Sequence, residues 1–268
     1  MQPYSKDFQP AWWCPAAHGQ TIWAGVLRPV PHVPTIRRRW ELPDGDFIDI
    51  DILGAPPAAP RLIILHGLES SSGAPAVLGL IQQARSRGWG AVAISAPFDL
   101  AASVVSLGKG FSRIYQRNLV AALKQKTLQK LARFPDLVNK QALIKVRTLG
   151  EFDDLVTAPV HGFKDAKTYW AASSSTQFLG RIQRPTLLIN AEDDPFLPRE
   201  ALPRQAVAGN KYLSAAFTAT GGHIGFLTGA IPALPVSWAE EHACGFLERY
   251  LGKGNGVLES GPNLTTAL

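Results

Sequence analysis

Short apolar runs that switch abruptly to polar residues mark the strands of a predicted sheet. The clearest run covers residues 186–189 of the segment PTLLINAEDDPFLP, and an acidic loop with Asp193 and Asp194 follows it at once. Central parallel strands deliver polar side chains to the carboxyl edge of a sheet in this way. Residues 62–65 and 90–95 form similar runs. The pattern predicts an α/β fold with a mostly parallel sheet.

Other patterns predict a hairpin and several helices. Residues 38–53 form two extended runs around an Asp-Gly pair, and the second run alternates apolar and acidic positions, which is typical of a β-hairpin. Residues 74–87 read as a helix that Gly88 ends. Residues 98–184 are helical and basic in character, with short helices near 141–149 and 165–171, and 236–251 reads as a final helix that packs back on the sheet.

These elements predict one domain with three parts. The core comprises residues 36–97 and 185–252, and the helices of 98–184 form a cap over the carboxyl edge of the sheet. Residues 1–35 are expected to pack across the body as an ordered strap, because their large apolar rings would not stay wholly in water. These rings belong to Trp12, Trp13 and Trp23.

Composition bounds the class of protein. The chain has 268 residues, 46% of them hydrophobic and 18% charged, which is enough for one substantial core. It has no basic-then-apolar leader and no apolar run near 18 residues, so we expect a soluble, unexported, cytoplasmic protein. Cys14 and Cys244 have no metal-ligand spacing; we expect free thiols, although one disulfide between them is compatible with the count.

Positive charge is concentrated in one part of the chain. The formal net charge is +6, but the stretch from Lys109 to Arg147 holds ten Lys and Arg residues against one acid, Asp136. Such an excess could attract anionic membrane lipids, acidic substrates or nucleic acid. A solvated helical face is the simpler interpretation and the one that we favour.

A carboxylate after a late strand is followed further along the chain by a loop histidine. Asp194 lies in the acidic loop that follows the apolar run of residues 186–189, and His223 lies between glycines further along the chain. This order matches the last two members of the Ser, Asp, His order of α/β-hydrolases. Asp193 is a close competitor for the acidic role. Separately, Asp194 could merely cap the turn before Pro195, and His223 could be a structural histidine.

The loop after the run of residues 62–65 is a candidate oxyanion hole. It reads His66, Gly67, Leu68. Backbone N–H groups at this place in α/β-hydrolases stabilise the negative charge that develops on the substrate carbonyl oxygen.

Eight short motifs, in order along the chain, resemble those of the YheT-like α/β-hydrolases, the bacterial relatives of the animal ABHD1 and ABHD3 proteins. They are HGQTI (18–22), LPDGDF (42–47), HGLE (66–69), SAPFDL (95–100), GFSR (110–113), EFDD (151–154), DDPF (193–196) and GGHIGF (221–226). The resemblance implies an α/β-hydrolase fold and a serine hydrolase of carboxylic esters, with Asp194 orienting the base His223 and with no metal or organic cofactor. A small-molecule ester or acyl ligand is the expected partner.

The nucleophile of that family is missing from its usual place. The resemblance implies a serine in a G-x-S-x-G elbow ahead of residues 95–100, and the chain contains no such motif. Residues 87–90, RGWG, run almost directly into the strand 91–95. A block with some central strands and the elbow is therefore predicted to be deleted, and the protein to be weakly active or inactive.

Several alternatives remain open. Ser95 could replace the nucleophile, although relatives carry this serine as well as their elbow serine; Ser70, Ser71 and Ser72 read as turn or cap residues. The chain could be a non-catalytic binding protein for an acyl or acidic ligand. A basic-surface anion or nucleic-acid module ranks last, because no nucleic-acid motif is present, and we expect no nucleic acid as partner. Missing strands also predict an exposed sheet edge, lower stability and self-association through that edge.

Overall fold

The computed structural model describes residues 8–42, 47–53, 64, 68, 70–84, 91–232 and 234–251. In this part of the chain, strands β3 (Ala91–Ile94), β4 (Thr186–Ala191) and β5 (Leu213–Thr218) form a parallel sheet in the order β3-β4-β5. The strands predicted at 90–95 and 186–189 are thus confirmed. The strand predicted at 62–65 lies outside the described residues except Ile64, which is in no strand.

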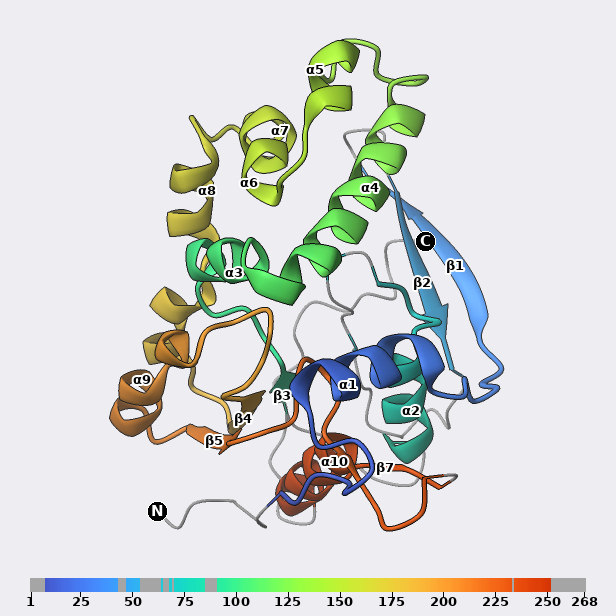
Figure 1. Cartoon of the computed structure of the whole chain (residues 1–268), viewed down its shortest axis with the longest axis vertical. Helices are drawn as coiled ribbons and strands as arrows, with labels where there is room; N and C mark the ends of the chain where they lie inside the picture. The colour runs from blue at the N-terminus through green and yellow to red at the C-terminus, as the bar shows by residue number, and fades with distance from the viewer. Residues whose placement is uncertain are drawn as a thin grey trace, which may run out of the picture.

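Strand β4 is buried along its whole length because helices cover both faces of the sheet (Figure 1). Leu187 and Ile189 point to the face covered by α10 (Trp238–Leu251) and α2 (Pro75–Ala84). Leu188 points to the other face, towards Phe98 and the segment η4 (Ser175–Arg181). The period of two along a strand therefore builds two separate apolar clusters.

The hairpin of β1 (Ile36–Glu41) and β2 (Phe47–Ile52) is antiparallel as predicted, and the residues of its turn lie outside the described part. Its two faces differ. One carries Arg37–Asp51 and Arg39–Asp49, each a pair of N–H···O bonds of 2.7–2.8 Å. The guanidinium of Arg37 and the Ser72 hydroxyl lower the pKa of Asp51 to about 2. The other face exposes an apolar set: Ile36, Trp40, Ile48 and Ile52.

Residues 98–184 are largely helical and stand above the sheet in Figure 1. The helix predicted near 165–171 is present as α8 (Ala166–Ser173), whereas the one predicted near 141–149 is shorter than expected, because α5 (Lys140–Lys145) ends before residue 146. Asp99, Asn139, Thr148 and Asp165 accept a backbone N–H at four helix starts, which explains where these helices begin. The elements are α3 (Leu100–Leu107), η2 (Gly110–Ser112), α4 (Arg113–Lys130), α5 (Lys140–Lys145), α6 (Leu149–Phe152), η3 (Asp153–Thr157), α7 (Ala158–Val160), α8 (Ala166–Ser173) and η4.

The N-terminal segment crosses the molecule and contacts the last third of the chain. The N–H of Ala11 donates to the carbonyl of Leu227 at 2.9 Å, and Phe8 packs against Phe226 and Trp238. Helix α1 (Ala17–Ile22) continues into the π-helix η1 (Trp23–Leu27). Trp12 is 73% exposed, and its indole N–H donates to the carbonyl of Ala230 at 2.9 Å.

The remaining elements complete the C-terminal third. They are η5 (Arg199–Ala201), α9 (Arg204–Gly209), β6 (Leu227–Thr228) and β7 (Val236–Ser237), and β6 pairs with β7. No disulfide joins Cys14 to the buried Cys244. None of the helices described is long and apolar enough to span a membrane. The division into core, cap and strap stays a prediction.

Candidate active site

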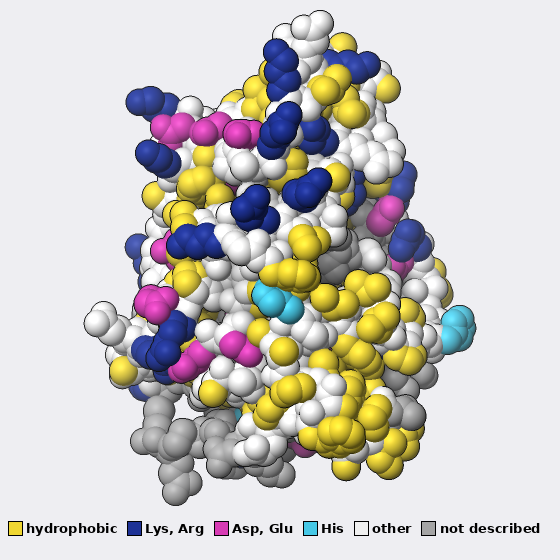
Figure 2. Space-filling view, in the orientation of Figure 1, with side chains coloured by type: hydrophobic (Ala, Val, Ile, Leu, Met, Phe, Trp, Pro, Cys, Tyr) yellow, Lys and Arg dark blue, Asp and Glu magenta, His cyan; other side chains and the backbone are white. Residues whose placement is uncertain are grey.

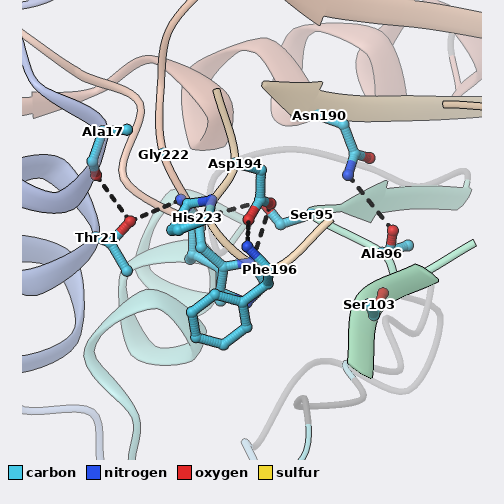
Figure 3. Close-up of polar contacts among 12 residues, drawn as sticks. Ala17, Thr21, Ser95, Ala96, Ser103, Asn190, Asp194, Phe196, Gly222 and His223 are labelled. Carbon is cyan, nitrogen blue, oxygen red and sulfur yellow. Dashed lines mark hydrogen bonds and ion pairs between the residues drawn. The ribbon is translucent and has the colours of Figure 1, made fainter. Parts of the chain in front are cut away.

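Two turns at the carboxyl edge of the sheet bring Asp194 and His223 together. Asp194 follows β4 and His223 follows β5, and Asp194 Oδ2 lies 3.0 Å from His223 Nδ1. The other carboxylate oxygen, Oδ1, accepts the N–H of Phe196 at 2.8 Å. Asp194 is buried, whereas 20% of the His223 side chain is exposed. A buried carboxylate with both oxygens bound fixes the tilt of the imidazole (Figure 3).

The ring of Phe196 holds the face of the same imidazole. The two rings are stacked, with centroids 4.0 Å apart and planes 7° apart. Asp194 thus orients the imidazole through Nδ1, and Phe196 covers one face of the ring. No hydrogen bond reaches Nε2 of His223 from any residue that the structure describes.

The backbone that carries the histidine is held by three side-chain oxygens. The consecutive N–H groups of residues 222–224 donate, in order, to Asp193 Oδ1 (2.9 Å), Thr21 Oγ1 (2.9 Å) and Ser95 Oγ (3.0 Å). These oxygens come from the acidic loop, from α1 and from the end of β3. Figure 3 shows Thr21 and Ser95 reaching the loop from different elements. The position of His223 therefore depends on segments far apart in the sequence.

The loop needs this support because its backbone is strained. Ile224 has φ +63°, a left-handed conformation that β-branched residues rarely adopt. Gly222 has φ +62°, and a Cβ at this position would lie 2.3 Å from the carbonyl oxygen of Ala17. Glycine is therefore required at 222 for both conformation and space. The hydrogen bond from Ile224 to Ser95 helps to hold the unusual geometry.

Ser95, the speculative nucleophile, lies beside the histidine loop but its hydroxyl is engaged there. Ser95 is buried, has φ +51°, and its N–H donates to the carbonyl of Ile189 at 2.8 Å. Its Oγ accepts the N–H of Ile224 and makes no hydrogen bond with His223. In this structure Ser95 therefore supports the backbone of the histidine loop.

The predicted oxyanion loop is largely outside the described residues. His66 and Gly67 fall in that part, and Leu68 is described as exposed. Of the nearby serines, Ser72 donates to Asp51, and the carbonyl of Ser71 accepts the N–H of Ala74 in a turn. Among the residues described, no cluster of His, Cys, Asp and Glu could hold a metal ion.

Asp193 has a role different from that of its neighbour. Burial raises the pKa of Asp193, the N–H of Gly222 opposes this rise, and the nearby Asp194 adds to it. Asp193 contacts the backbone of the histidine loop, so it supports the loop while Asp194 pairs with the ring. Sequence reasoning missed Thr21 and Phe196 as site residues, although both lie inside motifs that carried the family resemblance. Their contacts with His223 have no local signal in the sequence, because they depend on how distant segments pack.

Comparison with known proteins bears on the family. No family model and no solved structure matches the chain. The candidate esterase YheT of Escherichia coli K12 is 31% identical over 92% of this chain and 94% of its own length. This chain belongs to the YheT-like α/β-hydrolases. The family resemblance and the α/β-hydrolase fold class predicted from sequence are thereby confirmed.

Further relatives of this YheT-like chain match over shorter stretches. Monoacylglycerol lipase of Saccharomyces cerevisiae is 32% identical over 59% of the chain and 36% of its own length. Phospholipase ABHD3 of Mus musculus is 29% identical over 44% of the chain and 29% of its own length. The alignment with YheT runs over 323 positions, more than the 268 residues of this chain, so part of it has no counterpart here.

Proposed function

We propose that the protein keeps the acid and the base of a carboxylic-ester hydrolase but lacks the nucleophile, so that its ester turnover is absent or very weak. The pairing of Asp194 with His223 at 3.0 Å supports the acid and base roles. The lack of any G-x-S-x-G sequence supports the loss of the nucleophile. The long alignment with YheT agrees with a deleted block. Two relatives named for lipid substrates make acylglycerol-type esters the favoured class.

The chemistry of the family explains why this loss matters. His223 would take the proton of a serine hydroxyl as that oxygen attacks the ester carbonyl, and Asp194 would stabilise the imidazolium that forms. Without a serine Oγ at Nε2 of His223, no acyl-enzyme forms, and one difficult step is not divided into two easier ones. Only the residual acceleration due to binding and oxyanion donors is left.

A fluorophosphonate probe tests the proposal directly, because it forms a covalent adduct only with an activated serine. Intact mass spectrometry of the purified chain should show no adduct. Ser95→Ala and His223→Ala are treated in parallel, and Ser106→Ala serves as the control, since Ser106 lies in α3 and its hydroxyl donates to the carbonyl of Pro195. A stoichiometric adduct that both Ser95→Ala and His223→Ala abolish, but Ser106→Ala keeps, would overturn the proposal and make Ser95 the nucleophile.

A non-catalytic binding protein is the second candidate, and it is favoured by the partly exposed His223, whose Nε2 makes no hydrogen bond with any residue in the described part of the chain. A protonated imidazole with a buried carboxylate behind it can pair with the carboxylate of a fatty acid. Calorimetric titration with a medium-chain fatty acid should then show saturable binding that His223→Ala weakens by about tenfold. Ester turnover in the same sample without such binding would favour the enzyme instead.

A further inference from the structure

The corner between η2 and α4 exposes apolar side chains between cations. Phe111 and Ile114 are 48% and 46% exposed. Lys109, Arg113 and Arg117 are exposed on the same two elements or directly before them. Large apolar side chains on a surface that is also strongly basic are unusual for a face that contacts only water.

The three cations at this corner are not neutralised. Among the residues described, no carboxylate forms an ion pair with Lys109, Arg113 or Arg117. The nearest acid in the sequence after them is Asp136, beyond the end of α4. The corner therefore presents positive charge that an external anion can approach.

The exposed apolar surface continues onto the N-terminal helix. His18 of α1 lies against Tyr115 of α4, with Nδ1 3.1 Å from the phenol oxygen. At the end of η1, which continues α1, Val26 is 75% exposed and Leu27 is also exposed. Figure 2 shows Lys and Arg side chains across the upper half of this face and a broad hydrophobic area below them. Charge and apolar surface thus adjoin on one side of the molecule.

Ring contacts connect this corner with the candidate active site. Phe111 lies 5.9 Å from Tyr115, Tyr115 lies 5.2 Å from Phe196, and Phe196 stacks on His223 at 4.0 Å, all between ring centroids. A ligand that contacts Phe111 would therefore be connected with the imidazole of His223 through three successive ring contacts.

We propose that the corner of η2 and α4, with the exposed end of η1, docks on anionic lipid membranes. Lys and Arg side chains next to exposed aliphatic and aromatic ones are what a lipid surface with negative headgroups recognises. Nucleic acid would be bound through the cations, but Ile114, Val26 and Leu27 would contribute nothing to a phosphate chain. Docking goes beyond the proposed function and does not require turnover; only the supply of a lipid ester to His223 would rest on it.

Vesicle co-sedimentation of the full chain tests the docking surface. Vesicles of phosphatidylcholine with roughly one third phosphatidylglycerol should bind the protein at low salt and release much of it at high salt. Each Lys or Arg near such a surface contributes about fivefold in affinity, so the double variant Arg113→Glu, Arg117→Glu should bind about 30-fold more weakly or worse. Lys164→Glu, Lys167→Glu is the matched control, because it changes the net charge equally at exposed positions around α8.

A second variant separates lipid insertion from simple charge attraction. Ile114→Ser, Val26→Ser keeps every charge and should still lose at least about fivefold in vesicle affinity, because the apolar side chains no longer enter the bilayer. Circular dichroism checks that each variant is folded as the parent protein is. The proposal would be overturned if the two charge variants lost equal affinity, or if the protein bound pure phosphatidylcholine vesicles equally well. It would also be overturned if the serine variant bound vesicles fully and single-stranded RNA displaced the protein from them. Fluorophosphonate labelling is independent of these results, so the two proposals fail separately.

Discussion

Replacing Thr21 by valine should loosen the histidine loop without altering the shape of the core. Thr21 is buried in α1, its Oγ1 accepts the N–H of His223 at 2.9 Å, and its hydroxyl donates to the carbonyl of Ala17 at 2.8 Å. Valine has nearly the same volume but no hydroxyl. The variant therefore leaves the N–H of His223 without an acceptor.

The size of the effect follows from that single lost acceptor. A buried N–H with no partner costs about 1–3 kcal/mol, and we expect the free energy of unfolding of Thr21→Val to fall by this amount. Thr21→Ser is the matched control. It keeps the oxygen and removes one methyl group, which costs about 0.8 kcal/mol or less.

Two measurements check this prediction. Urea unfolding of both variants, with equal slopes, gives the difference in free energy. Hydrogen exchange followed by mass spectrometry on the peptide that contains residues 221–226 should show faster exchange in Thr21→Val than in Thr21→Ser. If the two variants agreed within about 0.3 kcal/mol and exchanged alike, the Thr21 hydroxyl would not be what holds His223 in place.

Three further predictions test other parts of the structure. Gly222→Ala should lower the free energy of unfolding by at least about 2 kcal/mol, because Gly222 has a positive φ and a Cβ there would collide with the carbonyl of Ala17 in α1. Gly209→Ala is the control and should be nearly neutral, since a Cβ at that position meets nothing within 4 Å. Urea unfolding of the two variants gives the difference. Asp51 has a depressed pKa of about 2, so its ion pair with Arg37 stabilises the hairpin fully above about pH 3.9, the pKa of the unfolded state, and this stabilisation is lost as the pH falls through about 2. Carboxyl NMR of Asp51 should show a titration midpoint near 2, and a midpoint near the unfolded value would contradict the prediction. The exposed apolar face of the hairpin should drive concentration-dependent association in sedimentation velocity, which Trp40→Lys and Ile48→Lys should abolish; a monomer at every concentration would argue against it.

The fold could be predicted where the pattern is local. Alternation in the second strand of the hairpin has the period of a strand, and the short apolar runs at β3 and β4 end at polar residues or turn signals, as short buried strands do. Trp12 keeps a hydrogen bond from its indole N–H to Ala230 although most of its side chain is exposed, and no local pattern in the sequence predicts that contact. Strand 62–65 and the oxyanion residues His66 and Gly67 lie outside the described residues, so these stay predictions.

The site could be predicted only in part. Asp194 and His223 each follow a strand, so the parallel sheet alone brings them to one edge. Thr21 and Phe196 could not be assigned to the site in this way. A hydroxyl in the first helix and a ring after a proline have many uses, and their contact with the histidine depends on how distant segments pack.

The three oxygens that hold residues 222–224 join segments of the chain that are synthesised at very different times. Their sequence separations from the partner N–H groups are 29, 202 and 129 residues for Asp193, Thr21 and Ser95. Closing such long loops costs entropy that only the late contacts repay, and contacts of this kind form slowly. On the ribosome, the first helix must wait for nearly the whole chain to be made before it meets the histidine loop. Full support of the loop that carries His223 therefore requires a contact between the first and the last parts of the chain.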